Sequence, residues 1–296
     1  MRVFLTGATG FIGSAIVPEL LKAGHQVIGL TRSDAGAQAL AAAGVQAHRG
    51  SLEDPDSLRA GAIQADGVIH CAFDHDFSNF VANCQKDTRA IEALASALKG
   101  SDRPLVITSG VGMGSPGPGQ PATEDVFNLD HPNPRSASEI AGAAALETGV
   151  NVSVMRLPQV HDPVKQGLIT PSIEIARAKG VSAYVGDGAN RWAAAHVLDV
   201  ARLYPLALQR GQAGARYNAV AEEGVSAREI AEVVGAGLKL PVVSLTPEEA
   251  AGHFGWFAMF AGLDMPASSA WTRETLGWTP TGPGLIADLR AMDYGV

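Results

Sequence analysis

Cysteine and positive charge are both scarce in this chain of 296 residues. The two cysteines, Cys71 and Cys84, are too few for a disulfide framework, so we expect reduced thiols and a cytoplasmic protein. Lys and Arg number 22 against 30 Asp and Glu, which gives a formal net charge of −8. Nucleic-acid binding depends on phosphate contacts from a surplus of basic residues, so nucleic acid is excluded as a partner.

Long apolar runs are also missing. No stretch approaches the roughly 20 residues that span a bilayer, so we expect no membrane partner. The opening MRVFLTGATG lacks the apolar segment of a signal peptide. The eight histidines form no HxxxH or HxH pair, and we expect no metal site. Hydrophobic residues nevertheless make up 46% of the chain, which excludes disorder and suffices for a large core.

Short apolar runs alternate with helical patterns along the first half of the chain. This alternation predicts an α/β fold, a Rossmann-type doubly wound parallel sheet with a small C-terminal substrate lobe. We expect a nucleotide-binding domain at 1–157 with return elements near 192–220, and a substrate lobe at 158–191 and 221–296. The predicted strands are 3–5, 26–30, 45–48, 66–71, 105–109 and 152–156. The predicted helices include 11–23, 35–43, 79–98, 136–148, 171–179, 196–209, 227–238 and 247–261, with capping boxes at Ser226-x-x-Glu229 and Thr246-x-x-Glu249.

A glycine-rich turn joins the first strand to the first helix. Its spacing is GxxGxxG, with Gly7, Gly10 and Gly13. Glycine permits the tight turn, the approach of backbone to a pyrophosphate and the packing of helix on strand. The helix N-terminus then presents free N–H groups to the phosphates. In this strand–turn–helix context the turn predicts a dinucleotide site that includes Thr9, Phe11 and Ile12.

The residues after the second strand indicate which dinucleotide binds. An NAD enzyme usually has a carboxylate there for the ribose 2′-hydroxyl. This chain has Arg32 and Ser33, and no carboxylate before Asp34. The planar guanidinium of arginine suits a 2′-phosphate, so we expect NADP(H); the alternative is an ordinary surface arginine.

Six motifs resemble those of the short-chain dehydrogenase/reductase superfamily, in its extended and atypical branches with epimerase/dehydratase-like folds. They are TGATGFIG at 6–13, GSLEDPDSL at 50–58, VIHCAF at 68–73, VITSG at 106–110, RLPQVHD at 156–162 and HVLDVARLY at 196–204. The resemblance implies a Rossmann domain with a small substrate lobe, and a homodimer through the long helices, although these helices are rich in alanine and show no self-complementary signature. It also implies further cofactor contacts from Ser51, Leu52, Cys71, Ala72, Phe73, Thr108, Pro158 and Val160.

The catalytic pattern of the superfamily is altered in this chain. By the resemblance a tyrosine, a lysine four residues later, an upstream serine and an asparagine are expected. Arg135 stands at the tyrosine position, Glu139 at the lysine position and Asp87 at the asparagine position. The serine register falls on Gly110, one residue after Ser109, and no YxxxK occurs anywhere in the chain.

Glu139 has two interpretations. It can close a capping box with Ser136, or it can transfer a proton near the nicotinamide if burial raises its pKa. Ser109 is the candidate for orienting a carbonyl. Asp74, His75, His161, Tyr184 and Trp192 are candidates for the substrate pocket, each with a plain packing or loop role as the alternative.

These observations lead to two hypotheses from different classes. The first is an NADPH-dependent reductase of a ketone or aldehyde on a small, partly apolar molecule, with a proton donor other than tyrosine. The second is a catalytically silent NADP(H)-binding sensor or scaffold. A nucleotide-sugar epimerase is disfavoured because the proton-shuttling tyrosine is missing.

Overall fold

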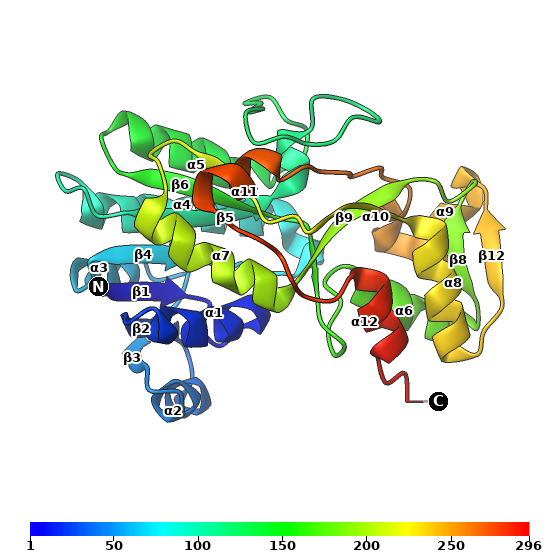
Figure 1. Ribbon diagram of the computed structural model, residues 1–296, viewed down its shortest axis with the longest axis horizontal. Coiled ribbons are helices and arrows are strands. Elements are labelled where there is room, and N and C mark those ends of the chain that lie inside the picture. The colour runs from blue at the N-terminus through cyan, green and yellow to red at the C-terminus, as the bar shows by residue number, and fades with distance from the viewer. Residues whose placement is uncertain (296) are drawn as a thin grey trace.

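A seven-stranded parallel sheet forms the centre of the larger domain. A computed structural model describes residues 1–295 of the chain (Figure 1). The strand order is β10-β6-β5-β4-β1-β2-β3, with every neighbouring pair parallel. The bounds are β1 (Arg2–Thr6), β2 (Gln26–Thr31), β3 (Gln46–Arg49), β4 (Gly67–His70), β5 (Leu105–Gly110), β6 (Val152–Leu157) and β10 (Arg216–Asn218). This confirms the predicted doubly wound sheet, and β1 to β6 lie within one residue of the predicted strands at each end.

Helices cover both faces of this sheet. One face buries side chains of α1 (Phe11–Lys22), α2 (Asp34–Ala42) and α7 (Val197–Arg210). The other face buries side chains of α3 (Pro55–Ile63), α4 (Phe80–Leu98) and α5 (Ser136–Glu147). Because parallel strands are covered on both faces, β1, β4 and β5 are almost entirely buried and each has an apolar run at its centre.

The smaller lobe lies beyond the carboxyl ends of the strands, to the right in Figure 1. Its three-stranded sheet contains β7 (Gln159–His161), β9 (Arg191–His196) and β11 (Glu222–Ser226), and a parallel pair joins β8 (Ser182–Val185) to β12 (Val242–Leu245). The helices are α6 (Ile169–Lys179), α8 (Ala227–Leu238), α9 (Pro247–Phe254), α10 (Ala258–Ala261) and α12 (Leu285–Ala291). These elements share a core of their own, rich in phenylalanine.

One C-terminal segment departs from the predicted division of the chain. Residues 221–296 were expected in the substrate lobe, but α11 (Ala270–Leu276) packs beside β10 and α7 of the larger domain. Leu276 and Trp278 are buried in the core under the sheet, and the Trp278 indole donates to the Asp199 carbonyl at 3.0 Å. The burial of these two apolar side chains fixes the segment to the larger domain.

Two local expectations also change. The helix predicted at 247–261 ends at Phe254, because Gly255 has a φ of +55° and a short 3₁₀ turn (Gly255–Phe257) precedes α10. The Thr246–Glu249 capping box is reciprocal. At the start of α8 the Ser226 hydroxyl accepts from the Glu229 N–H, but among the described residues the Glu229 carboxylate does not accept from the Ser226 N–H in return.

No helix within residues 1–295 combines the length and apolar character needed to cross a bilayer.

Candidate functional site

The glycine turn after β1 is built for close backbone contact. Gly7 has a φ of +74°, and a Cβ there would lie 2.9 Å from the Ala72 nitrogen. A Cβ on Gly13 would lie 1.9 Å from the Gly7 carbonyl oxygen, so α1 packs on the turn only with glycine. Gly10 caps α1 without a side-chain bond, and the first turn of α1 contains no acidic residue. The helix N-terminus therefore offers free N–H groups and a partial positive charge, which fits the pyrophosphate of a dinucleotide.

Arg32 and Ser33 lie at the end of β2, where the adenosine ribose of such a dinucleotide would lie. Arg32 is exposed and makes no hydrogen bond or ion pair within residues 1–295. The Ser33 hydroxyl caps α2 by accepting from the Gly36 N–H at 3.1 Å, which leaves its proton free to donate. On the neighbouring strand end the Ser51 hydroxyl accepts from the Glu53 N–H, and Leu52 is half-buried.

A buried hydrogen-bond chain connects the ends of β1 and β4 to α4. The Thr6 hydroxyl lies 2.7 Å from His70 Nδ1, and His70 Nε2 lies 3.0 Å from a carboxylate oxygen of Asp87. A carboxylate only accepts, so His70 Nε2 donates to Asp87, and the Thr6 hydroxyl is the hydrogen-bond partner of Nδ1. Burial acts to raise the pKa of Asp87, but nearby Arg135 and His70 outweigh it, and the pKa lies below its usual value. Asp87 is thus an anion in the interior.

Arg135, at the position where the resembled superfamily has tyrosine, is the partner of that anion. Its Nη1 donates to Asp87 at 2.9 Å and to the Ser138 hydroxyl, and its Nη2 donates to the Thr108 carbonyl at 2.7 Å. These bonds use three of the five N–H groups of a guanidinium. The guanidinium lies 4.2 Å from the centre of the Phe73 ring, and the side chain is 14% exposed. Arg135 therefore combines a fixed position with unused donors at the site.

Glu139 lies one helical turn further along α5 and points into the domain. Arg156 binds both of its carboxylate oxygens at 2.8 Å, and Arg216 Nε donates to one of them at 3.2 Å. The predicted capping box is absent, because α5 begins after Arg135 with no side-chain cap. The proton-transfer interpretation also disagrees with this geometry, because the 1% exposed carboxylate accepts hydrogen bonds from two guanidinium groups. The reason is that β6 and β10 each place an arginine beneath α5.

Thr108 and Ser109, near the end of β5, have different surroundings. The Ser109 hydroxyl is buried and has no hydrogen-bond partner within residues 1–295. The Thr108 hydroxyl lies 2.8 Å from the Tyr204 hydroxyl, which donates to the Cys71 sulfur. Burial raises the pKa of the Cys71 thiol to about 11. Cys71 is therefore a neutral packing group and Ser109 is a hydroxyl with bonding capacity to spare.

The loop after β4 carries a cluster of aromatic rings. Asp74 is bound by Lys86 at 2.8 Å, whereas the exposed His75 ring is flanked by Phe73 at 5.3 Å and Phe77 at 6.2 Å between ring centres. Desolvation by these surroundings, and then the positive charge of Arg135, lower the pKa of His75. Phe77 in turn stacks on Trp256 of the small lobe at 5.2 Å. Aromatic contacts thus continue from the carboxyl end of β4 to the small lobe.

The remaining predicted pocket residues lie elsewhere. His161 on β7 is fully buried and binds Asp288 of α12 at 2.7 Å, with His196 packed against it at 5.9 Å between rings. Burial lowers the pKa of His161, although Asp288 acts in the opposite direction. No contact in residues 1–295 joins His161 to His75.

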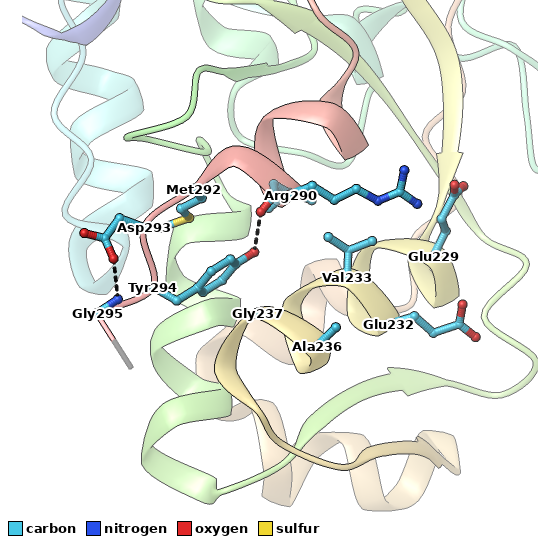
Figure 2. Close-up of a pocket in the computed structure, with 11 residues that line it drawn as sticks. Glu229, Glu232, Val233, Ala236, Gly237, Arg290, Met292, Asp293, Tyr294 and Gly295 are labelled. Carbon is cyan, nitrogen blue, oxygen red and sulfur yellow. Dashed lines mark hydrogen bonds between the residues drawn. The ribbon is translucent and has the colours of Figure 1, made fainter.

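Tyr184 and Trp192 line an apolar cavity inside the small lobe, together with Phe254 and Phe257. Figure 2 shows a second hollow, between α8 and the C-terminal residues, whose wall carries Glu229, Glu232 and Arg290. None of the predicted site residues lines that second hollow. The structure therefore brings together the glycine turn, Phe73, His75 and Arg135, and separates them from His161, Tyr184 and Trp192.

The fold is of Rossmann type, with a glycine turn of the dinucleotide-binding kind after the first strand, and comparison with known proteins gives the family. The chain belongs to the NAD dependent epimerase/dehydratase family, whose model matches residues 3–220. An uncharacterized protein of Schizosaccharomyces pombe is 45% identical over 295 residues, 99% of this chain and 100% of that protein. A UDP-glucose 4-epimerase of Streptomyces lividans is 28% identical, covering 95% of this chain and 92% of its own.

Solved structures agree on the fold. The UDP-glucose 4-epimerase of Thermotoga maritima superposes with a TM-score of 0.76 at 20% identity, over 99% of this chain and 97% of its own. Relatives in the family include both epimerases and reductases, so the chain has the fold of an oxidoreductase-type enzyme. The resemblance found in the sequence motifs is thereby confirmed.

The sequence reasoning missed the role of His70 and undervalued Arg135 and Asp87. Two of them were visible in the sequence: His70 ends the buried strand β4, and Asp87 lies on the buried face of α4. A buried acid seventeen residues after a buried histidine indicates a pair, because buried charges need partners. The sequence could not supply the third member, since α5 approaches α4 only in the folded chain.

Proposed function

We propose that the protein is an NADPH-dependent reductase of a ketone or aldehyde on a small, partly apolar molecule. The proposal rests on Arg135, whose guanidinium is held by Asp87 and keeps two N–H groups without a partner in residues 1–295. The glycine turn, with Gly7, Gly10 and Phe11, would hold the pyrophosphate. Ala72, Phe73, Thr108, Pro158 and Val160 would follow toward the nicotinamide end. The bound dinucleotide supplies the hydride.

Arg135 replaces the tyrosine of the resembled superfamily in polarising the carbonyl. Its free N–H groups donate to the carbonyl oxygen and stabilise the negative charge that develops there as the hydride arrives. Asp87, fixed by His70 and Ser138, holds the guanidinium in place. Ser109 contributes a further hydroxyl, because its oxygen has no partner among the residues that the structure describes.

A guanidinium orients and stabilises, but its high pKa makes it a poor proton donor. His75 packs beside Phe73 and is exposed to solvent, so its imidazole relays a proton from water to the alkoxide. Glu139 is excluded from this step in the proposal, since it is an acceptor in each bond it makes.

The test is consumption of NADPH, followed by absorbance, over a panel of aromatic and aliphatic ketones and aldehydes. Binding of NADPH is measured on the same sample. Turnover of any member, lost in Arg135→Gln while NADPH still binds, supports the reductase. Tight binding without turnover supports the second candidate, a silent NADP(H) sensor, which is motivated by the missing tyrosine and lysine and by the neutralisation of Arg135 by Asp87.

The choice of NADPH over NADH rests on Arg32. Replacing Arg32 by Glu should weaken NADPH binding and favour NADH, because a carboxylate repels the 2′-phosphate and accepts from the 2′-hydroxyl. We expect a reversal of the ratio of the two dissociation constants by about tenfold or more. Arg59→Glu, a charge reversal at an exposed arginine on α3, is the control. If the ratio of the NADPH and NADH dissociation constants is unchanged in Arg32→Glu, Arg32 does not bind the 2′-phosphate.

A further inference from the structure

The loop after β7 places one lysine next to the glycine turn. Asp162 organises this loop by accepting from the N–H groups of Val164 and Lys165 at 2.8 and 2.7 Å. The Lys165 carbonyl accepts in turn from the Asp162 N–H at 2.9 Å. The loop backbone at Lys165 is therefore fixed by a closed set of hydrogen bonds, and its long side chain extends from a defined point.

The ammonium of Lys165 lies over the start of α1. Its Nζ is 5.6 Å from the centre of the Phe11 ring, within the range of a cation–π contact. Phe11 is the first residue of α1 and follows Gly10, which caps the helix without any side-chain bond. The lysine thus approaches the helix end that presents unbonded N–H groups, from the side of the small lobe.

Lys165 has no carboxylate partner within residues 1–295. Lys86, by contrast, binds both Glu53 and Asp74 at 2.9 and 2.8 Å. The charge of Lys165 also reaches the opposite wall, where it helps, after desolvation and Arg135, to lower the pKa of His75. The ammonium of the exposed Lys165 side chain therefore lies near Phe11 and acts on His75, and no carboxylate within residues 1–295 neutralises it.

We propose that Lys165 closes over the dinucleotide and binds its pyrophosphate, opposite the N–H groups of α1. The inference rests on the proposed dinucleotide site and adds to it a cation from the substrate lobe. An ammonium is a point charge on a flexible stem, which suits a phosphate group that arrives after the loop is formed. Binding of cofactor would thereby draw the two lobes together.

The experiment compares Lys165→Met with Lys99→Met, which removes the same charge from an exposed residue at the end of α4. Dissociation constants are measured for NADPH, by its fluorescence, and for adenosine 2′-monophosphate, by competition. The monophosphate occupies the Arg32 end but has no pyrophosphate. We expect Lys165→Met to weaken NADPH about tenfold, the range of a charge-assisted contact, and adenosine 2′-monophosphate less than about twofold. Lys99→Met should change neither.

Other outcomes overturn the proposal in distinguishable ways. Equal NADPH affinity in Lys165→Met and wild type would exclude a pyrophosphate contact while leaving the dinucleotide site intact. If in addition the KM rose only for carbonyl compounds bearing a carboxylate, Lys165 would be a substrate residue and the proposal would be wrong. Failure of the wild type to bind NADPH or NADH would remove both the proposed function and this inference.

Discussion

At the scale of the residue, Arg135 shows how a neighbouring charge decides what a side chain does. An arginine at this position would be hydrated and mobile if it had no partner. Here the buried carboxylate of Asp87 and the Thr108 carbonyl fix its position at 2.9 and 2.7 Å. Fixed donors cost little reorganisation when charge develops on a substrate, which is the source of their catalytic value.

The prediction for this residue concerns Arg135→Lys. Lysine keeps the charge but lacks the planar set of donors, so it cannot bind Asp87 and a carbonyl oxygen together. We expect kcat to fall by about a hundredfold, with the NADPH dissociation constant little changed. Steady-state kinetics on a substrate found in the panel, with circular dichroism to verify folding, gives the answer. A kcat equal to that of the wild type in Arg135→Lys would contradict the proposal that the Arg135 guanidinium polarises the carbonyl.

At the scale of the element, the packing of α1 on β1 determines whether the glycine turn of the proposed cofactor site can form. Gly7 and Gly13 face each other across the turn, and the Gly7 carbonyl occupies the space of any Cβ on Gly13. Gly10 serves another purpose, since it leaves the helix end uncapped. The spacing of the motif is thus set by two different needs, close packing and open N–H groups.

Gly13→Ala tests this packing. The new methyl would lie 1.9 Å from the Gly7 oxygen, which is backbone and cannot rotate away, so α1 must shift. We expect the free energy of unfolding to fall by about 1–3 kcal/mol and NADPH binding to weaken together with it. Gly252→Ala in α9 is the matched control, because nothing lies within 4 Å of its Cβ and alanine should raise stability by about 0.5–1 kcal/mol. Denaturant unfolding and NADPH titration of both variants test this prediction. Unimpaired NADPH binding in Gly13→Ala would show that the site does not need glycine at position 13.

At the scale of the whole molecule, a buried ion cluster joins parts that are far apart in the sequence. Glu139 on α5 binds Arg156 on β6 and Arg216 on β10. Arg156 also donates to the carbonyls of Thr123 and Val126 at 3.0 and 2.8 Å, which holds the long loop before α5 against the sheet. One carboxylate therefore supports a helix, two strands and a loop.

Glu139→Gln should lower the free energy of unfolding and leave kcat unchanged. Without the carboxylate, two guanidinium groups remain in the interior with no counter-charge, at an expected cost of about 3–5 kcal/mol in the free energy of unfolding. The kcat of the folded fraction should stay near that of wild type. Glu147→Gln, at an exposed position on the same helix, should change neither quantity. A lost kcat with unchanged unfolding would restore Glu139 as a proton-transfer residue.

Local sequence determined the elements and the cofactor edge. Strand and helix positions follow from the alternation of apolar and polar residues over short windows, and the glycine turn requires only seven consecutive residues, so β1 to β6 and the turn were predictable. The place of residues 270–278 was not, because a buried tryptophan does not show which of two cores it enters.

The partners of charged side chains were decided by tertiary structure alone. Asp87 meets Arg135 across 48 residues, and Glu139 meets Arg216 across 77. Which guanidinium a buried carboxylate meets depends on how α5 lies on the sheet, and no periodicity encodes that contact. The sequence therefore determined the glycine turn of the proposed dinucleotide site. The folded chain decided that Arg135 meets Asp87 and that Glu139 meets Arg156 and Arg216, because long-range packing, and not local pattern, pairs buried charges.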